Sequence, residues 1–469
     1  MEHVTVGDLV KATGGILLWG SKEENIHKIR LDSRTVEPGD LFVPVIGEKV
    51  DGHTFIPQVV RLGAKAVLTG RKEEWGLTEQ EKGNTAFIQV GDTKEALQDI
   101  GRYLRARLSL PLIGITGSVG KTTTREMIAA ALAARYRVYK TPGNKNSQVG
   151  VPITISEISK EDQVGVIELG MSEPGELTVI AKIAKIDMAV ITNIGITHIE
   201  QLGSRENIYR EKMTIQDGLK DGGVLILNGD DDMLSATKGR DGIETIYYGT
   251  GKNCDFRAED IVLRDGKAEF TAVYKNNRQK IQLNVMGQHN VLNAMAAVAV
   301  CVRCGMTMEE AARGLFTFTG FKNRQQVYRG ERMTILDDSY NASPASMKAA
   351  LDVFKTLQPE SRHVAVFADM KELGEQTLSY HKEVGQYAAR SGPDLVVTLG
   401  EACHALAEGI RETSRIPVKE FADKDEMVSY LDGELKDGDC VLFKGSNSMG
   451  LFAVAKRYLA RAGVKQDDI

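Results

Sequence analysis

A glycine-rich segment, flanked by a strand-like run and a helix-like stretch, constrains this chain more than any other feature. It reads Gly-Ile-Thr-Gly-Ser-Val-Gly-Lys-Thr-Thr over residues 114–123. Glycines let backbone N–H groups wrap a phosphate without Cβ clashes, a lysine reaches the β- and γ-oxygens, and a hydroxyl binds Mg²⁺ where the helix begins. The helix N-terminus adds favourable partial charge. This order predicts an ATP site with Mg²⁺, formed by Gly117, Ser118, Gly120, Lys121, Thr122 and Thr123.

The glycine spacing of this loop departs from the commonest pattern, in which four residues separate the first glycine from Gly-Lys. Here five residues separate Gly114 from Gly120, and Gly117 lies closer. The loop is therefore a variant, and its alternative is a glycine-rich turn with an incidental lysine. The strand before it and the helix after it favour the phosphate loop, but they leave the reaction open.

Three regions can be separated along the 469 residues. Residues 1–92 precede a helix-like segment, 93–108, whose apolar residues recur at helical spacing. In residues 93–319 and again in 320–469, strand-like and helix-like segments alternate, which predicts mostly parallel, doubly wound sheets. The strand-like runs are 41–45, 112–116, 164–169, 188–192, 224–227, 333–336, 363–367, 395–399 and 440–443.

Two local patterns refine this division. Between residues 255 and 285, short alternating segments separated by turns predict an antiparallel insertion. A helix should begin at Ser343-Pro344, with serine as the N-cap and proline in the first turn. The expected fold is α/β in three domains: a small N-terminal domain, a central domain with a mostly parallel sheet and the insertion, and a C-terminal Rossmann-like domain.

The charge and composition argue against two classes of partner. Basic residues number 59 and acidic residues 64, so the net charge of −5 gives no electrostatic reason to expect nucleic acid or an anionic membrane. The N-terminus does not resemble a signal peptide, and no apolar run approaches the roughly 18 residues of a membrane span. An odd, sparse set of five cysteines suits a reducing compartment. We therefore expect a cytoplasmic protein.

Cys301 and Cys304 form a CxxC pair inside the helical apolar run 294–302. A metal or redox motif is one interpretation, but there is no second pair nearby. We interpret both as small buried hydrophobic residues.

Polar residues follow several strands of the predicted central sheet, where ligands of open α/β sheets gather. Glu168 ends one strand and could serve the same Mg²⁺ as Thr122. Its alternative is a solvated or salt-bridged acid. His198 follows another strand, and Lys212 lies in a polar helix-like stretch, 204–213. By themselves, a lone histidine is usually structural and a lone lysine usually solvated.

Two further segments suit a nucleotide. Asn290 and Asn293 open a helix after Gly287, and asparagine amides can pair with an adenine edge, although capping explains them equally well. Asp337 and Asp338 follow a strand of the third region and could accept ribose hydroxyls. Their alternative is a turn that leads into the capped helix.

Taken together, these motifs resemble the Mur ligase family in order and context along essentially the whole chain. Asp32-Ser33-Arg34, Pro38-Gly39-Asp40 and Asp51-Gly52-His53 look like the family's uridine-nucleotide domain. The Asp-Asn-Pro-Arg signature of the diaminopimelate-adding relative is absent. The stretches most similar to the member that adds D-alanyl-D-alanine are 144–152, 168–175, 337–344, and 369–375 with His381.

The resemblance implies roles for individual residues. Thr122 and Glu168 would hold one Mg²⁺, His198 a second, and Lys212 would be carbamylated and directed at the metal. Asn290 and Asn293 would face adenine, with Arg324 and Asp337 near the nucleotide and Asp337 on its ribose. Lys444 would approach the reacting phosphate when the domains close. The residues implied to bind the UDP-linked substrate are Ser33, Arg34, Asn146 and Ser147.

The implied activity is ATP-dependent ligation of D-alanyl-D-alanine to a UDP-N-acetylmuramoyl-tripeptide through an acyl-phosphate, by a monomer in peptidoglycan precursor synthesis. One departure from the family pattern affects the residues implied in domain closure. After Lys444 the chain has Asn447 where the family tends to have arginine, and the glutamate that usually follows is missing.

Two alternative functions remain. A sister ligase would add a single amino acid to a related acceptor, and a nucleotide switch would bind ATP without ligation.

Overall fold

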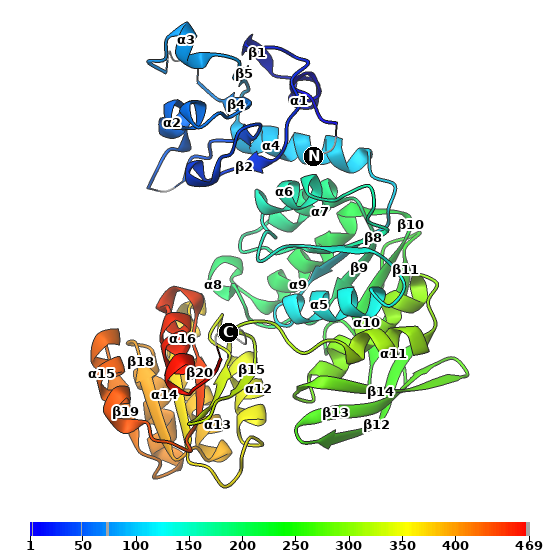
Figure 1. Ribbon diagram of the computed structural model, residues 1–469. Helices are drawn as coiled ribbons and strands as arrows, with labels where there is room; N and C mark the ends of the chain where they lie inside the picture. Colours follow the sequence, from blue (N-terminus) through cyan, green and yellow to red (C-terminus); the bar gives the residue numbers. More distant parts are fainter. Residues whose placement is uncertain (2, 48, 72–74, 466–469) are drawn as a thin grey trace.

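The computed structural model describes residues 1, 3–47, 49–71 and 75–465, and it contains three α/β units, each built on its own sheet. The units follow one another along the chain, and the central unit contacts both others (Figure 1). This arrangement confirms the predicted fold class. In the described part of the chain, no helix combines the length and the apolar character needed to cross a membrane.

The N-terminal unit has five strands in the order β1-β5-β4-β3-β2, and only β1 runs antiparallel to its neighbour. The predicted strand 41–45 is shorter than expected, because pairing ends before Pro44, which has no N–H to donate. The elements are α1 (Val6–Thr13), β1 (Ile16–Trp19), β2 (Ile29–Arg30), β3 (Leu41–Phe42), α2 (Ile56–Arg61), β4 (Ala66–Thr69), α3 (Glu79–Lys82), β5 (Ala86–Gln89) and the connecting helix α4 (Thr93–Ala106).

The central unit has nine strands in the order β14-β13-β12-β11-β10-β9-β6-β8-β7. The predicted antiparallel segment is confirmed as β12–β14, which extends the main sheet beyond β11. The elements are β6 (Leu112–Thr116), α5 (Lys121–Leu132), β7 (Val138–Lys140), α6 (Gly150–Ser156), β8 (Val164–Glu168), α7 (Glu176–Ala184), β9 (Ile186–Ile191), α8 (Ile199–Leu202), α9 (Arg205–Met213), β10 (Leu219–Asn228), β11 (Glu244–Gly249), β12 (Phe256–Arg264), β13 (Lys267–Tyr274), β14 (Asn277–Met286), α10 (Asn290–Arg303) and α11 (Met308–Phe316).

The C-terminal unit has six strands in the order β15-β16-β20-β17-β18-β19, all parallel except β15. Ser343 caps α12 as predicted, because its side chain accepts the N–H of Ser346 and Pro344 occupies the first turn. The elements are β15 (Gln326–Arg329), β16 (Thr334–Asp337), α12 (Pro344–Phe354), β17 (His363–Ala368), α13 (Thr377–Ser391), β18 (Leu395–Leu399), α14 (Cys403–Thr413), β19 (Val418–Phe421), α15 (Lys424–Glu434), β20 (Cys440–Lys444) and α16 (Leu451–Arg461).

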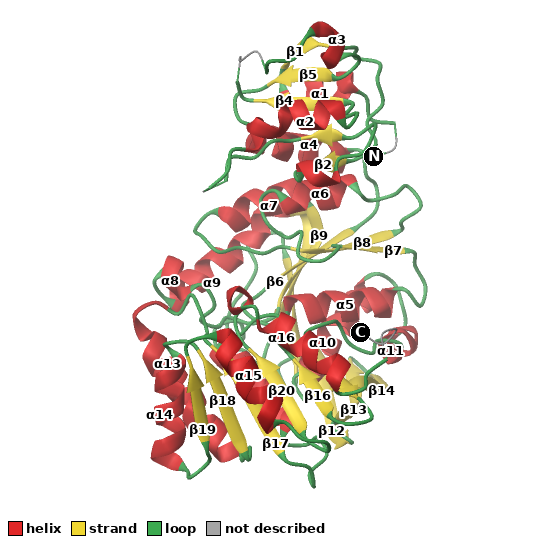
Figure 2. Ribbon diagram, turned by 60° about the vertical axis from the view of Figure 1, so that its left-hand side comes forward, coloured by secondary structure: helices red, strands yellow, loops and turns green. Residues whose placement is uncertain are grey.

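Helices cover both faces of the central sheet, with α6 and α7 on one side and α5 and α10 on the other (Figure 2). The interior strand β6, which lies between β9 and β8, is therefore buried along its whole length: Leu112 packs into one core, and Ile113 and Ile115 pack into the other. Because its neighbours β8 and β9 run parallel to it, the residues that follow these three strands meet at one edge of the sheet. The glycine-rich loop leaves β6 at this edge.

The cysteines are free, and Cys301 is fully buried in α10, as predicted, whereas Cys304 at the end of this helix is only partly buried. Burial raises the pKa of Cys254 and of Cys304 to about 11 and that of Cys440 to about 12. We therefore expect iodoacetamide to alkylate the folded protein slowly at pH 8, and all five thiols to react once the chain is unfolded. Rapid modification of Cys301 and Cys304 in the folded protein would contradict this.

The raised thiol pKa values also determine how alkaline pH changes the stability of the fold. Above the ordinary thiol pKa of 9.0, the unfolded chain loses protons that the folded protein keeps up to about pH 11. Each such thiol therefore contributes stability that is present below pH 9 and is lost as the pH rises toward 11. Urea unfolding at pH 8 and pH 10.5 measures the loss, and Cys304→Ala should reduce it.

Candidate active site

A cavity of about 670 Å³ lies between the central and C-terminal units. The glycine-rich loop, the ends of β8 and β9 and the start of α10 line it from one side, and segment 338–349 with Lys444 lines it from the other. Most of the site residues predicted from the sequence meet here: Ser118, Gly120, Lys121, Thr122, Thr123, Asn146, Ser147, Glu168, His198, Asn290, Asn293, Arg324 and Lys444.

The loop between β6 and α5 needs glycine at two positions. Gly117 has a φ of +147°, and a Cβ there would lie 1.9 Å from Thr192 Oγ1. Gly120, immediately before α5, has a φ of +86°. Gly114 lies inside β6 and is not part of the turn, which explains the unusual spacing in the sequence.

Lys121 begins α5 and folds back over this loop, where its Nζ donates to Gly117 O at 2.6 Å. Burial lowers the pKa of Lys121 below its usual value; the carboxylate of Glu168 opposes the shift and the nearby Arg324 adds to it. Arg324 itself has a buried Nε that has no hydrogen-bond partner among the described residues, and its guanidinium stacks 4.1 Å from the centre of the Tyr340 ring. Two cations therefore face the cavity where an anionic phosphate would lie.

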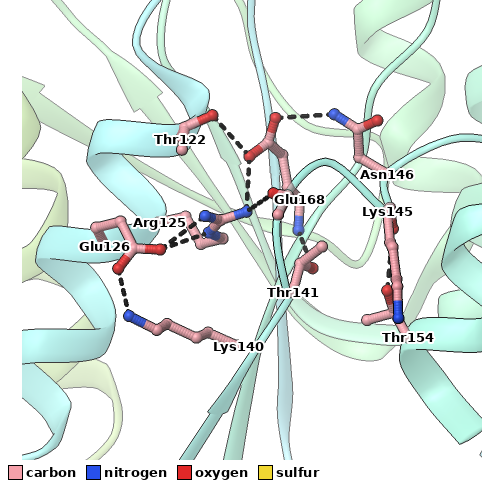
Figure 3. Close-up of polar contacts among 10 residues, drawn as sticks. Thr122, Arg125, Glu126, Lys140, Thr141, Lys145, Asn146, Thr154 and Glu168 are labelled. Carbon is pink, nitrogen blue, oxygen red and sulfur yellow. Dashed lines mark hydrogen bonds and ion pairs between the residues drawn. The ribbon is translucent and has the colours of Figure 1, made fainter. Parts of the chain in front are cut away.

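Thr122 and Glu168 come together as expected from their positions after adjacent strands (Figure 3). Thr122 Oγ1 donates to Glu168 Oε2 at 3.0 Å, and Asn146 Nδ2 donates to Oε1 at 2.9 Å. Glu168 is buried, so it is not a solvated acid, and Arg125 Nη1 pairs with Oε2 at 3.1 Å. A hydroxyl beside a carboxylate is the oxygen donor set that Mg²⁺ prefers, and the residues therefore fit this ion.

His198 contacts the C-terminal unit. The residue adopts a left-handed φ of +63° before α8, and its Nδ1 lies 2.5 Å from Glu372 Oε2. The contact with His198 lowers the pKa of Glu372, and the backbone N–H of Glu200 also donates to Glu372 O at 3.4 Å. His198 is thus neither solvated nor part of an internal core; it joins two units across the cavity.

Lys212 lies near the end of α9 with only 1% of its surface exposed. The common alternative, a solvated lysine, is therefore wrong here. Burial lowers the pKa of Lys212 well below its usual value, Lys121 lowers it further, and Glu211 acts in the opposite direction. Lys212 is outside the residues that line the cavity, but its amine is close enough to sense the charge of Lys121.

Asn290 and Asn293 bind each other rather than presenting free amides. Asn293 Nδ2 donates to Asn290 Oδ1 at 2.9 Å, and Asn290 Nδ2 donates to Met286 O at 2.7 Å. Thr124 of α5 in turn donates to Asn293 Oδ1 at 3.0 Å. The pair therefore ties the start of α10 to the phosphate-loop helix and leaves one N–H on each amide for a ligand.

Asp338, rather than Asp337, lines the cavity. Asp337 is 2% exposed and accepts from the N–H and hydroxyl of Ser339, at 3.1 Å and 2.5 Å, and burial raises its pKa. Asp338 Oδ2 accepts from Lys444 Nζ at 2.6 Å. The position implied for the ribose contact is thus held internally, and the adjacent acid neutralises Lys444.

Asn447, where the family tends to have arginine, donates from Nδ2 to Tyr340 O at 3.2 Å. Tyr340 is the ring on which Arg324 stacks. Asn447 therefore supports the segment that carries Asp338 and Tyr340, instead of offering a charge to the cavity.

Ser33 and Arg34 lie in the N-terminal unit, outside the residues that line the cavity. Ser33 is buried at the start of a short 3-10 helix, Ser33–Thr35, which Asp32 caps by accepting from the N–H of Arg34. The Arg34 side chain is exposed and pairs with Asp32 at 2.7 Å. The predicted substrate residues therefore belong to two places, with Asn146 and Ser147 at the cavity and Ser33 and Arg34 in the N-terminal unit.

His381 and Asp369 lie together with Cys403 in the core of the C-terminal unit, within the distance of a metal site. Both imidazole nitrogens are already used, since Nε2 accepts from the N–H of Met370 at 3.0 Å and Nδ1 bonds Thr377 O at 2.7 Å. Asp369 Oδ1 accepts from the N–H of Cys403 at 2.9 Å. This cluster fastens loops together and does not offer a metal site.

Three family models match successive parts of the chain. They are described as the Mur ligase family catalytic domain at residues 25–105, the Mur ligase middle domain at 115–301, and the Mur ligase glutamate ligase domain at 323–447. The UDP-N-acetylmuramoyl-tripeptide–D-alanyl-D-alanine ligase of Bacillus subtilis (strain 168) is 36% identical over 456 residues, which cover 96% of this chain and 97% of that protein. The chain belongs to the Mur ligase family.

Solved Mur ligase structures share the architecture. MurF from Acinetobacter baumannii superimposes with a TM-score of 0.86 at 31% identity, over 97% of this Mur ligase and 98% of that chain. MurF from Thermotoga maritima in complex with ADP gives a TM-score of 0.80 at 28% identity, over 94% of this chain and 100% of that one. The three-unit architecture is thus that of known MurF structures.

Several residues at the Mur ligase site could not be found from motifs. Arg125 and Glu372 each contact a predicted residue, yet neither has a role assigned from the sequence. The signal available for Arg125 is its place on α5 one turn after Thr122, which puts both side chains on the same face.

Proposed function

We propose that the chain is an ATP-dependent ligase that joins D-alanyl-D-alanine to the tripeptide carboxylate of a UDP-N-acetylmuramoyl-tripeptide. One observation carries the proposal: the cavity where the phosphate loop of the central unit meets Arg324 and Lys444, in a chain similar over nearly its whole length to ligases of that name. The need for ATP agrees with a cytoplasmic reaction.

The nucleotide would lie along the phosphate loop. Backbone N–H groups of residues 117–122 and the amine of Lys121 would hold its phosphates, and the Asn290–Asn293 pair would contact the adenine through its remaining N–H groups. Thr122 and Glu168 would hold Mg²⁺, which neutralises phosphate charge when bound. The N-terminal unit, with Ser33 and Arg34, would bind the uridine end of the substrate.

The reaction would proceed in two transfers. The tripeptide carboxylate attacks the γ-phosphorus, the bond to the bridging oxygen breaks, and ADP leaves with an acyl-phosphate remaining. The free amine of D-alanyl-D-alanine then attacks the acyl carbon, the C–O bond to phosphate breaks, and the amine loses its proton. Lys121, Arg324 and Lys444 would offset the charge that gathers on the phosphoryl oxygens. To contact the phosphate, the Lys444 amine must first break its ion pair with Asp338.

A second metal contact would come from His198 and from Lys212 in carbamylated form. Carbamylation joins the Lys212 amine to CO₂ with loss of a proton, and it converts the buried amine into an anionic oxygen donor. The support is the burial of Lys212 close to Lys121, together with the family resemblance of its position. Glu372 lies at Nδ1 of His198, so Nε2 would be the nitrogen that binds the metal, with Glu372 orienting the ring.

Release of ADP with each substrate alone and with both together tests the proposal. A ligase of this specificity should release ADP at its full rate only when the UDP-tripeptide and D-alanyl-D-alanine are both present, because the acyl-phosphate needs one to form and the other to be consumed. A nucleotide switch would hydrolyse ATP without either.

The second candidate, a sister ligase, is separated in the same assay. Replacing D-alanyl-D-alanine with single amino acids should give only background release. Full turnover with one of them, and none with the dipeptide, would assign the chain to that activity instead.

A further inference from the structure

Arg125 is the largest fully buried side chain described, and it lies directly behind the proposed metal ligands (Figure 3). Its Nη1 donates to Glu168 Oε2 at 3.1 Å and to Gly143 O at 2.9 Å, and its Nη2 donates to Glu126 Oε1 at 2.7 Å. The ring of Phe321, which lines the cavity, lies 5.7 Å from the guanidinium carbon. The planar fork of arginine can reach these partners at once, whereas a lysine ammonium cannot.

The charges around Arg125 balance without a metal. Glu126 accepts from Arg125 and also pairs with Lys140. Two cations, Arg125 and Lys140, thus face two carboxylates, Glu126 and Glu168. Because Glu126 offsets the guanidinium, Arg125 can hold Glu168 without adding net positive charge where Mg²⁺ would bind.

The two oxygens of Glu168 are held from different sides. Asn146 donates to Oε1, and both Thr122 and Arg125 donate to Oε2. Thr122 donates through a neutral hydroxyl, whereas Arg125 donates through a charged guanidinium that is fully buried. Arg125 is then the charged group that keeps Oε2 in place.

We propose that Arg125 is a positioning residue for the metal site. Its guanidinium holds the carboxylate of Glu168 opposite Thr122, so that the Glu168 carboxylate and the Thr122 hydroxyl oxygen would both face Mg²⁺. The inference rests on the proposed metal site of Thr122 and Glu168. Partners that orient metal-ligating carboxylates typically contribute 10–100-fold to metal affinity.

The test is binding of Mn²⁺ to the full-length protein with ADP present, measured by the electron paramagnetic resonance signal of free Mn²⁺. Arg125→Lys keeps the charge but loses the fork, and it should weaken Mn²⁺ binding by about tenfold or more. The ligation rate of this variant should recover when the Mg²⁺ concentration is raised, with kcat close to wild type and an increased requirement for metal.

Arg105→Lys is the matched control. Arg105 is also a buried arginine of this chain, and its guanidinium donates to Ala184 O, Leu108 O and Lys185 O, none of which belongs to the proposed metal site. Its replacement should lower thermal stability without changing Mn²⁺ affinity.

The outcomes separate the two proposals. Mn²⁺ affinity of Arg125→Lys equal to wild type would overturn the role of Arg125, and so would a loss of kcat that no metal concentration restores. Failure of the wild-type protein to bind Mn²⁺ with ADP would overturn the metal site itself. If Arg125→Lys unfolds, Arg125→Gln in the same assay decides, since it keeps planar N–H donors and should bind Mn²⁺ more weakly than wild type.

Discussion

Replacing Lys121 with alanine is expected to lower the rate of ligation by at least about a hundredfold and to leave the fold intact. Removal of one positioned group that stabilises developing charge commonly costs about 2.7–4 kcal/mol, or roughly 10²–10³ in rate. Lys121 satisfies this description, because it begins α5, bends over the loop to Gly117 O, and faces the cavity beside Arg324. Among the described residues, the Lys121 amine donates hydrogen bonds only to the loop carbonyls of Gly117 and Ser118. The packing of the core therefore does not depend on this amine.

Steady-state ADP release with both substrates measures this effect, and circular dichroism with thermal unfolding measures the fold. Lys182→Ala is the matched control, since Lys182 is an exposed lysine on α7 of the same unit. Turnover of Lys121→Ala near the wild-type rate would remove the basis for the ATP site. A collapse of thermal stability would instead show that the loop conformation itself depends on this amine.

Lys212→Ala is expected to cause the second largest loss, of about a hundredfold or more, because it removes a whole ligand from the proposed metal site. The loss should be partly reversible. A short-chain carboxylate, such as acetate or propionate, can occupy the space left by the lysine stem and present oxygens where the carbamate would be. Loss of the ammonium itself should not destabilise the fold, because burial already disfavours its charged form.

The measurement is ligation by Lys212→Ala with increasing carboxylate, compared with wild type under the same additions. Arg210→Ala provides the control, since Arg210 is an exposed residue on the same helix. Activity of Lys212→Ala equal to wild type would show that the lysine has no role in ligation. Low activity that no carboxylate raises would argue against the carbamate and leave a packing role for the lysine stem.

The phosphate loop and the approach of Thr122 to Glu168 could be predicted, because both follow from local order along the chain. A buried strand, a glycine turn and a helix fix the loop, and parallel neighbours place the ends of β6 and β8 at one edge. The cap at Ser343 and the antiparallel strands β12–β14 were predictable for the same reason, since turn and cap chemistry is local.

Contacts between units could not be predicted in this way. The pairing of His198 with Glu372 depends on how two sheets are oriented, and nothing near either residue encodes that orientation. The burial of Arg125 and Lys212 was equally hidden, because a charged residue on a helix is normally solvated and only the tertiary neighbours decide otherwise. Asp337 and Asp338 are adjacent, so only the path of the backbone after β16 decides which of them reaches the cavity.

The contact between His198 and Glu372 also has a thermodynamic consequence. An imidazole whose Nδ1 faces Glu372 keeps Nε2 as its remaining ligand atom, and a carboxylate on one ring nitrogen makes the other a better ligand. A metal bound through Nε2 at the proposed second position and the present docking of the C-terminal unit would therefore strengthen each other by the same factor. The orientation of the last third of the chain would then depend on ion concentration, with one imidazole shared by both equilibria.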